Sequence, residues 1–431
     1  MKRITVAILI LVVVGLGGFT AFAWRPAIAP VVQPAPDQFP ADRVAYGAVL
    51  AAGGYCATCH TTKGSKPLAG GRAMVTTFGT LYSTNITPDP ETGIGNWSEA
   101  AFRRAMHEGV ARDGSHLFPA FPYDHFTKLS DDDVGALYAY LMTRPAVRAP
   151  ARANELPFPL GIRALQAGWK LLFFRPGRFI SDAGQDAEWN RGAYLADALG
   201  HCGACHTPRG MLGAEKRSEA YTGAMIDNWF APALTEANPS PVPWTSDELA
   251  SYLTTGISRF HGTAAGPMAP VVHDGLARLS PKDQKAIVRY FADLSGGDAR
   301  AADVAPAVAK AMTADLEGLG PAADRDDRFY TAACASCHYN AGAQPNPLRP
   351  DLALNSALSL PDPTNFIRVV LYGISAKDGA PAIIMPGFSR FSDADVARLG
   401  AYLRRTRTSL PPWPDIEKAV AKVRVEGRGD Y

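Results

Sequence analysis

Three short cysteine-histidine motifs constrain this chain more than any other feature of its sequence. Each reads Cys-x-x-Cys-His, and together they use all six cysteines of the 431 residues. They are Cys56-Ala57-Thr58-Cys59-His60, Cys202-Gly203-Ala204-Cys205-His206 and Cys334-Ala335-Ser336-Cys337-His338. Because one motif recurs three times, the fold around it is expected to recur as well.

The spacing within each motif suits covalent attachment of haem. Two thiols three positions apart on one helical turn can each add to a vinyl group of the same porphyrin, and the adjacent His then stands under the iron as a ligand. A zinc knuckle, a redox dithiol and a structural disulfide are the alternatives for one such motif. Three motifs that use every cysteine favour haem instead. The sequence therefore predicts three covalently attached haem c groups, with proximal iron ligands at His60, His206 and His338.

A pattern of three helices surrounds each motif. A short helix leads into the motif, at residues 42–54, 189–200 and 325–333. A second helix ends in Gly followed by a β-branched residue, at Gly109-Val110, Gly256-Ile257 and Gly373-Ile374. A closing helix opens with a capping Ser and has a Tyr ten residues later, at Ser130 and Tyr140, Ser280 and Tyr290, and Ser392 and Tyr402.

No long alternating strand pattern competes with these helices. The predicted fold is all-α, with three tandem class I cytochrome c-like domains behind an N-terminal transmembrane helix. Large apolar side chains predict an ordered strap packed over the haem domains between the first two repeats, because a solvated linker would not carry them. The predicted boundaries are 1–25 for an anchor or signal segment, 40–145 for domain 1, 146–186 for the strap, 187–297 for domain 2, 298–322 for a looser connector, 323–410 for domain 3 and 411–431 for a C-terminal tail.

Two methionines are candidates for the second axial ligand of the iron. A haem that only transfers electrons usually has such a ligand, commonly Met, which raises its potential. Met268 lies twelve residues after Gly256, and Met385 lies twelve residues after Gly373, each beside a proline. Because two repeats place a Met at the same offset, we predict that Met268 and Met385 bind iron.

The first repeat departs from this pattern. The same offset from Gly109 gives Phe121, which cannot bind iron. His125 lies four residues further along the loop, and His116 lies five residues before Phe121. An imidazole ligand would give a bis-His haem of lower potential, since Met stabilises the reduced iron. We predict His125 as the ligand, with His116 or an open five-coordinate iron as the alternatives.

The N-terminus has the features of a membrane anchor. Lys2 and Arg3 precede an uncharged apolar run from Ile4 to Trp24, which as a helix of about 30 Å can cross a bilayer. The basic residues place the start of the run in the cytoplasm and the haem domains in the periplasm. Ala21-Phe22-Ala23 also resembles a signal-peptide cleavage site, so a cleaved signal is the alternative. We expect a retained anchor, because the run exceeds the usual apolar region of a signal peptide.

The charges and the remaining motifs limit the classes of function. The formal net charge is +2 without a basic block, so no nucleic-acid partner is expected. The sequence has no Gly-rich dinucleotide fingerprint, nucleophile elbow or further metal cluster. These observations predict an electron-transfer protein that has no catalytic residues and docks with other proteins.

Four longer stretches, Gly79–Asp89, Gly93–Ser98, Phe118–Tyr123 and His201–Arg209, carry a family resemblance. Together with the motifs, they resemble the triple-haem cytochrome c subunit of bacterial membrane-bound dehydrogenases, which serves alcohol, aldehyde, gluconate and nicotinate oxidation. In the branch paired with quinoprotein alcohol or flavin-dependent sugar dehydrogenases, Met typically stands at the place of Phe121. Phe121 with Asp124-His125-Phe126 is more similar to the branch paired with molybdenum hydroxylases, whose small subunit holds [2Fe–2S] clusters.

The resemblance implies a role inside a larger complex. Electrons would pass from a catalytic subunit that oxidises aldehydes or N-heterocycles, through three haems, to ubiquinone or a terminal oxidase in the inner membrane. A quinoprotein alcohol dehydrogenase or a flavin-dependent sugar-acid dehydrogenase is the alternative partner. Two further hypotheses are a haem enzyme with an open first haem, motivated by Phe121, and a soluble carrier released by cleavage at Ala23.

Overall fold

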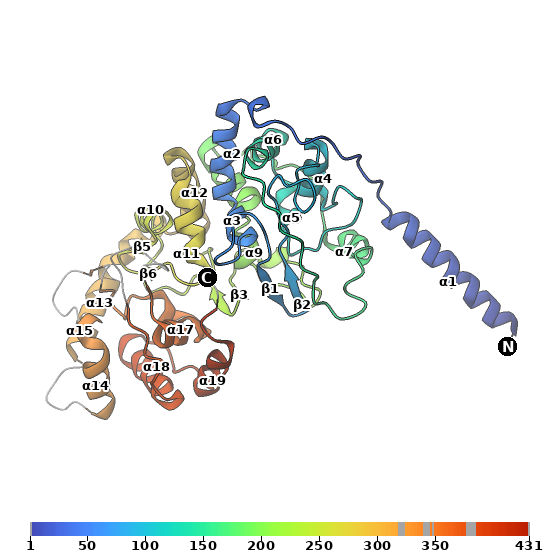
Figure 1. Cartoon of the computed structure of the whole chain (residues 1–431). Helices are drawn as coiled ribbons and strands as arrows, with labels where there is room; N and C mark the ends of the chain where they lie inside the picture. The colour runs from blue at the N-terminus through green and yellow to red at the C-terminus, as the bar shows by residue number, and fades with distance from the viewer. Residues whose placement is uncertain (1, 318–323, 339–344, 347–348, 376–384, 430–431) are drawn as a thin grey trace. The chain divides into compact units, whose positions relative to one another are not determined.

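The chain forms two compact units, of which Figure 1 gives the secondary structure. The computed structural model describes residues 2–317, 324–338, 345–346, 349–375 and 385–429. Unit 1 comprises residues 1–181 and 197–201, and unit 2 comprises residues 182–196 and 202–431. The first motif lies in unit 1, and the second and third lie in unit 2. The division of unit 2 into two domains and a connector stays a prediction, and residues 318–322 of that connector lie outside the described residues.

Unit 1 is mainly helical. Its helices are α1 (Lys2–Ala23), α2 (Ala41–Gly53), α3 (Cys56–His60), α4 (Glu99–Glu108), α5 (Tyr123–Phe126), α6 (Asp131–Met142) and α7 (Leu165–Phe173), with a 3-10 turn at Pro36–Gln38. Strand β1 (Ala73–Thr76) pairs antiparallel with β2 (Gly79–Tyr82). The prediction of an all-α fold missed this hairpin, because strands of four residues are too short to show a clear alternating pattern.

Helices α2 and α6 of unit 1 cross at close range. A Cβ atom at Gly47 on α2 would lie 2.0 Å from the carbonyl oxygen of Ala136 on α6 and 2.9 Å from Cβ of Tyr140. Only glycine lets the two backbones come so near. Leu50 on α2 and Val134 on α6 are also buried.

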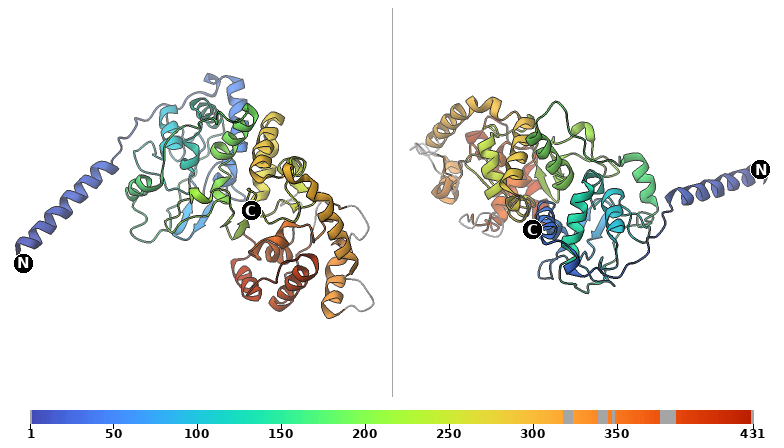
Figure 2. Two further views of the ribbon diagram at one scale, coloured as in Figure 1. Left: turned by 180° about the vertical axis from the view of Figure 1, so that it is seen from behind. Right: turned by 90° about the horizontal axis from the view of Figure 1, so that it is seen from above.

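Helix α1 projects from the rest of unit 1 (Figures 1 and 2). Among the described residues it is the one helix long and apolar enough to cross a membrane, from Arg3 to Ala23. Most of its side chains are exposed, but Ala23 is buried and its carbonyl oxygen lies 2.8 Å from Nε2 of His116. Further on, the amide of Ile28 donates to the carbonyl of Arg112 at 2.8 Å. The chain that leaves α1 is therefore built into unit 1.

Unit 2 contains the remaining elements. Its helices are α8 (Ala187–Tyr194), α9 (Gly203–His206), α10 (Ser246–Thr255), α11 (Met268–Pro270), α12 (Pro281–Ser295), α13 (Val304–Glu317), α14 (Arg325–Tyr330), α15 (Ser336–His338), α16 (Ser356–Ser359), α17 (Thr364–Tyr372), α18 (Asp393–Arg407) and α19 (Ile416–Glu426). Two antiparallel hairpins accompany them, β3 (Ala224–Ile226) with β4 (Trp229–Ala231) and β5 (Ile257–Ser258) with β6 (Gly262–Thr263). Short π-helical turns lie at Val271–Gly275 and Thr331–Ala335, and 3-10 turns at Arg217–Glu219, Leu276–Arg278 and Asp298–Asp303. A further π-helical turn, Leu195–Leu199, has its first two residues in unit 2 and the others in unit 1.

The close helix crossing of unit 1 recurs between α8 and α12 in unit 2. A Cβ atom at Gly192 would lie 2.0 Å from the carbonyl oxygen of Ala286 and 2.8 Å from Cβ of Tyr290. Helices α14 and α18 meet differently, because the hydroxyl of Tyr402 donates to Oδ1 of Asp327 at 2.9 Å. In all three pairs, the Tyr that follows the capping Ser packs against the helix that precedes the motif.

The helix ends follow the signals in the sequence. A backbone N–H three residues on donates to each predicted capping side chain, at Ser130, Ser280 and Ser392. Positive φ angles of 61°, 76° and 70° mark the predicted helix ends at Gly109, Gly256 and Gly373. These boundaries are confirmed.

Two segments outside the three repeats are more ordered than the sequence suggested. Helix α13, in the predicted connector, buries Ala311 in a cluster with Phe260 and Leu354. Helix α19, in the predicted C-terminal tail, buries Val420 and Val423 against α17 and α18. Apolar residues at helical spacing explain this packing.

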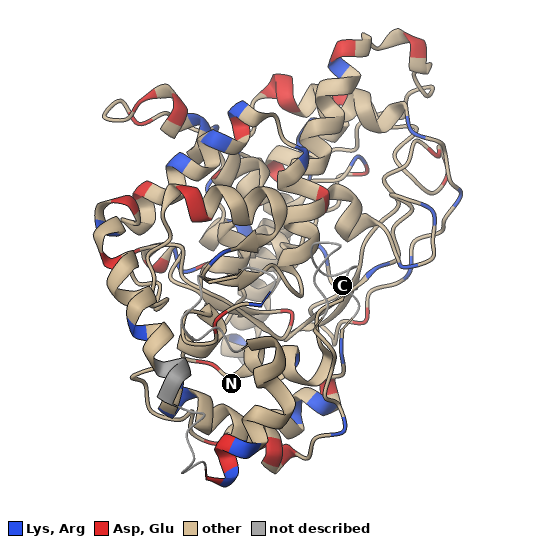
Figure 3. Cartoon of the chain, turned by 90° about the vertical axis from the view of Figure 1, so that its left-hand side faces the viewer, with Lys and Arg blue, Asp and Glu red and all other residues tan. Residues whose placement is uncertain are grey.

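Charged residues of both signs are spread over the helices that face the viewer in Figure 3. This distribution agrees with the small net charge of +2.

Candidate haem sites

The three motifs fold in a similar way. Each ends in a short helix, which is α3, α9 or α15. No disulfide joins any of the six cysteines. Because residues three apart lie on one side of a helical turn, the two thiols of a motif can reach a single flat group together.

Each motif histidine is held by the same hydrogen bond. Its Nδ1 lies 2.6 Å from the carbonyl oxygen of Thr84 in His60, 2.7 Å from that of Pro232 in His206, and 2.9 Å from that of Pro350 in His338. A carbonyl oxygen only accepts, so Nδ1 carries the proton and donates it. The lone pair is then on Nε2, the atom through which a histidine oriented in this way binds a metal. The donor set therefore fits haem iron at all three motifs.

Two of these carbonyl groups lie just after the second strand of a hairpin. Thr84 follows strand β2 by two residues, and Pro232 directly follows strand β4. In unit 1 the backbone of Gly70 lies close to that of Thr84, since a Cβ atom at Gly70 would lie 2.5 Å from the carbonyl carbon of Thr84. Gly70 has a φ of 77°, and its amide donates to the carbonyl of His60 at 2.7 Å. The sequence prediction missed these acceptors, because any residue supplies a backbone carbonyl.

Two arginines also contact the motif helices. Nη1 of Arg72 donates to the carbonyl of Thr58 at 2.7 Å, and Nη2 of Arg209 donates to that of Ala204 at 2.8 Å. Thr58 and Ala204 are equivalent residues, each just before the second cysteine of its motif. The arginines were missed as well, although Arg209 stands only three residues after His206.

The protonation states suit a metal ligand better than a redox dithiol. Burial lowers the pKa of His60 and His206, against the opposing effect of their hydrogen bonds, so the imidazoles are neutral. Burial and the neighbouring thiol raise the pKa of Cys56 to about 12 and that of Cys334 to about 11. A reactive dithiol needs a lowered thiol pKa. The raised values therefore speak against that alternative.

Met268 and Met385 lie in loops that follow the Gly-capped helices. Met268 begins α11, and the loop before it packs closely, since a Cβ atom at Gly266 would lie 2.4 Å from the ring of Trp229. Met385 pairs through its backbone with Ile374, with N–O distances of 3.0 and 2.9 Å. Both methionines are part-buried. Their role as iron ligands stays a prediction.

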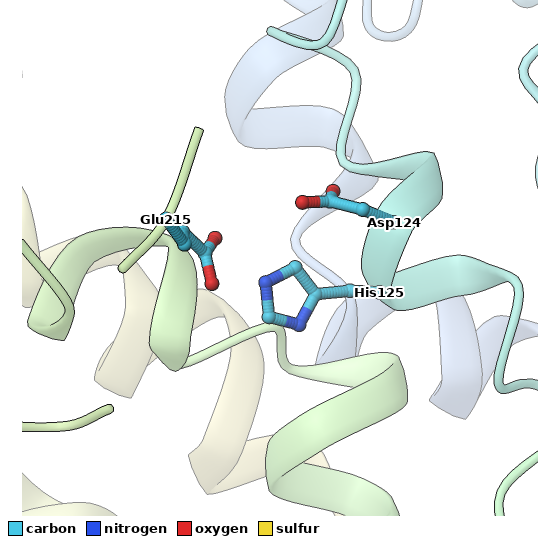
Figure 4. A group of neighbouring side chains, drawn as sticks. All are labelled: Asp124, His125 and Glu215. Atoms are coloured by element: carbon cyan, nitrogen blue, oxygen red, sulfur yellow. The ribbon is translucent and has the colours of Figure 1, made fainter. Parts of the chain in front are cut away.

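His125 projects from α5, next to Asp124, as Figure 4 shows. Its side chain is buried, and its Nδ1 lies 2.8 Å from the carbonyl oxygen of Asp197, also in unit 1. This is the bond type that orients the three motif histidines. Glu215, also drawn in Figure 4, belongs to unit 2, where it lies 3.7 Å from Arg209.

One layer of side chains connects α5 with the first motif. The ring of His201 lies 4.9 Å from that of Tyr55, which directly precedes Cys56, and 5.4 Å from that of Phe126 on α5. The hydroxyl of Tyr55 donates to the carbonyl of Gly200. The predicted ligand His125 therefore lies on the helix that reaches toward this motif.

His116 is held in a different environment. Its Nε2 donates to the carbonyl of Ala23 at 2.8 Å, and its Nδ1 lies 3.1 Å from Nζ of Lys170. Burial lowers the pKa of His116, as expected for a neutral ring that accepts a hydrogen bond from an ammonium group. Both ring nitrogens of His116 therefore have hydrogen-bond partners, which opposes a role for His116 as an iron ligand.

Two family profiles match the chain. The profile described as "Cytochrome c" matches residues 44–145, around the first motif. The profile described as "Cytochrome C oxidase, cbb3-type, subunit III" matches residues 321–403, around the third.

Several curated proteins that are subunits of dehydrogenases are also similar to the chain. The chain is 47% identical over 410 residues to a nicotinate dehydrogenase subunit of Pseudomonas putida, covering 94% of this chain but only 34% of that protein. It is 35% identical to the fructose dehydrogenase cytochrome subunit of Gluconobacter japonicus, covering 87% of this chain and 81% of the relative. It is 38% identical to the gluconate 2-dehydrogenase cytochrome c subunit of Pantoea cypripedii, covering 86% of this chain and 87% of the relative. The chain thus spans about a third of the first relative and most of the other two.

Proposed function

The chain belongs to the cytochrome c subunits of bacterial membrane-bound dehydrogenases, and we propose that it carries electrons through three haem c groups from a catalytic subunit to an acceptor in the membrane. One observation supports the proposed number of three haems. All three motif histidines donate through Nδ1 to a backbone carbonyl, which is the hydrogen bond that orients the ring of a metal-binding histidine.

Each part of a motif has a separate task in this proposal. The two cysteines hold the porphyrin by thioether bonds, and the proximal histidine binds the iron, which when bound supplies the one-electron chemistry. Met268 and Met385 would be the further iron ligands in their repeats and would raise the potential there. His125 would take that role in the first repeat, where the potential would be lower. The protein itself contributes ligation, burial and fixed haem positions.

The proposed catalytic partner is a molybdenum hydroxylase with a [2Fe–2S] subunit. The resemblance of Phe121 and Asp124-His125-Phe126 to that branch supports this partner. The 47% identity to a nicotinate dehydrogenase subunit supports it too, because nicotinate is an N-heterocycle. The substrate class of the complex is then aldehydes or N-heterocycles, and the electron acceptor is ubiquinone or a terminal oxidase.

We further propose that α1 is retained as a membrane anchor, with the haem domains in the periplasm. The docking of its last turn supports this. Ala23, the residue that a signal peptidase would sever from Trp24, is buried and accepts the hydrogen bond of His116. Cleavage there would remove a residue that packs into unit 1.

A sugar-acid or alcohol dehydrogenase is the second candidate partner. The identities of 38% to a gluconate 2-dehydrogenase subunit and 34% to a quinone-dependent alcohol dehydrogenase subunit of Gluconobacter oxydans favour it. Both relatives are covered over at least 80% of their length.

Purification of the chain from its native membrane tests both candidates. Solubilised membranes are reduced with nicotinate, an aldehyde, gluconate or ethanol, and the haem absorption is recorded before the attached subunits are identified by mass spectrometry. Reduction by nicotinate or the aldehyde, with a molybdenum subunit attached, is the expected result. Reduction by gluconate or ethanol alone, with a flavin or quinone subunit attached, would replace the first candidate by the second.

A further inference from the structure

The strap of unit 1 exposes a group of large apolar side chains. Six of them lie within residues 158–172, at Phe158, Leu160, Ile162, Leu165, Leu171 and Leu172. Phe158 is 90% exposed, and Leu171 and Leu172 are 65% and 60% exposed. The sequence led us to expect these side chains to pack over the haem domains. A cluster of exposed apolar side chains instead indicates a surface with a partner.

The exposure does not come from a loosely attached segment. The opposite side of α7 is seated in unit 1, where Ala167 and Phe174 are buried. Nζ of Lys170 donates to the carbonyls of Glu108 at 2.6 Å and Gly109 at 2.7 Å. These contacts fix the rotation of α7, so its apolar outer face points away from unit 1.

The outer face of α7 lies beside the end of the predicted membrane-spanning helix. Leu165, Gly168 and Leu172 share one side of α7, because they are three and four residues apart. A Cβ atom at Gly168 would lie 3.7 Å from Cε2 of Phe19 on α1. Phe19 precedes the last residue of α1 by four positions, which is about 6 Å along the helix. Helix α7 therefore lies beside the end of α1 that enters unit 1 (Figures 1 and 2).

The charges of the segment are of one sign. Between Glu155 and Asp182 the chain has no acidic residue, and its basic residues are Arg163, Arg175, Arg178, which pairs with Asp131, and Lys170, which points into unit 1. Trp24 and Trp169 flank the junction of α1 with unit 1, and Trp24 is 67% exposed. Basic residues and tryptophans beside apolar side chains are typical of a segment at the headgroup level of a bilayer.

We propose that residues 158–172 lie in the interface of the bilayer that α1 spans, with α7 along the membrane surface and its outer side chains among the lipids. The occupant of this apolar surface is phospholipid, because the surface continues directly from α1. The inference rests on the proposed retention of α1. The segment gives unit 1 a second attachment to the bilayer, which fixes the tilt of the unit on the membrane.

Photocrosslinking in native membranes tests the proposal with the full chain. Three variants place benzoylphenylalanine at Leu171, at Leu11 in the middle of α1, or at Val75 on strand β1. Val75 is the matched control, since it is 75% exposed in the same unit but lies outside the segment. The haem absorption of each variant verifies folding, and Phe158 provides a second position in the segment. The products are identified by mass spectrometry.

Lipid adducts at Leu171 and Leu11 but not at Val75 are the expected result. A lipid adduct at Leu11, with a polypeptide adduct or none at Leu171 and Phe158, would overturn the interfacial segment and leave the anchor intact. An absence of lipid adducts at Leu11 would overturn the retained anchor and, with it, this inference. Lipid adducts at all three positions, Val75 included, would show that the reaction does not discriminate and would also overturn the segment.

Discussion

The surroundings of the first and second motifs share the hydrogen bond of the motif histidine but differ in the loop after the Gly-capped helix. In both, a backbone carbonyl just after a hairpin accepts the hydrogen bond of the motif histidine. The distances from Nδ1 of His60 and of His206 to these oxygens are nearly equal. In the loop after the Gly-capped helix, unit 2 has Met268 where unit 1 has Phe121. Under the proposed ligation, attachment of the haem and tuning of its potential therefore reside in different loops of one repeat.

The largest expected effect comes from removing an attachment site. The double change of Cys202 and Cys205 to Ser should lower the covalent haem of the chain from three groups to two, and so should the same change at Cys56 and Cys59. The pyridine haemochrome assay and intact mass measure this ratio. Ser336→Ala, inside the third motif but outside its ligands, is the control and should keep all three haems.

Substitution of Met268 should have a smaller effect that is confined to the second repeat. Met268→Ala should remove the sulfur-to-iron absorption of one haem and lower its potential, because the thioether stabilises reduced iron. Phe121→Ala should leave the sulfur-to-iron absorption and the haem potentials unchanged. Potentiometric titration followed by absorption compares the two variants. Met225→Ala, at a half-exposed methionine, is the control, and an unaltered spectrum for Met268→Ala would refute the ligand prediction.

The third expectation concerns the ligand of the first haem. His125→Ala should convert one of the three haems to high spin, because it removes the imidazole that is the proposed second iron ligand of that haem. His116→Ala should keep all haems low-spin, since its ring nitrogens already bind Ala23 and Lys170. EPR spectra of the oxidised protein distinguish these outcomes. A first haem that is high-spin without any substitution would instead favour the enzyme hypothesis of an open iron.

The smallest expected effect is on stability and should be equal in both regions. Gly47→Ala and Gly192→Ala each place a Cβ atom about 2 Å from a carbonyl oxygen on the partner helix. Overpacking of this kind costs about 1–3 kcal/mol of unfolding free energy. Thermal or denaturant unfolding measures the loss. Gly161→Ala, which meets no heavy atom within 4 Å, should leave stability within about 0.5 kcal/mol, and a similar loss there would contradict the packing argument.

The sequence predicted those parts of the fold whose signals are local. Capping serines and C-terminal glycines fixed the helix ends, since the residues that terminate a helix act within one turn. The carbonyl acceptors at Thr84 and Pro232 could not be foreseen, because a backbone carbonyl has no residue type. The exposed face of α7 could not be foreseen either. Its leucines are equally compatible with a protein core and with a lipid surface, and only the positions of Lys170 and Phe174 decide which side faces inward.

The hydrogen bonds of the motif histidines also set an order in which each haem site can be completed. The acceptors follow their histidines by 24 residues in the first motif, 26 in the second and 12 in the third. Attachment to the thiols requires only the five residues of a motif, whereas orientation of the imidazole requires the downstream chain to have returned. Under the proposed function, the absorption spectrum of the iron in each repeat therefore reports whether that repeat has folded. Since a shorter loop closes at a lower entropic cost, the third site should register completion most readily.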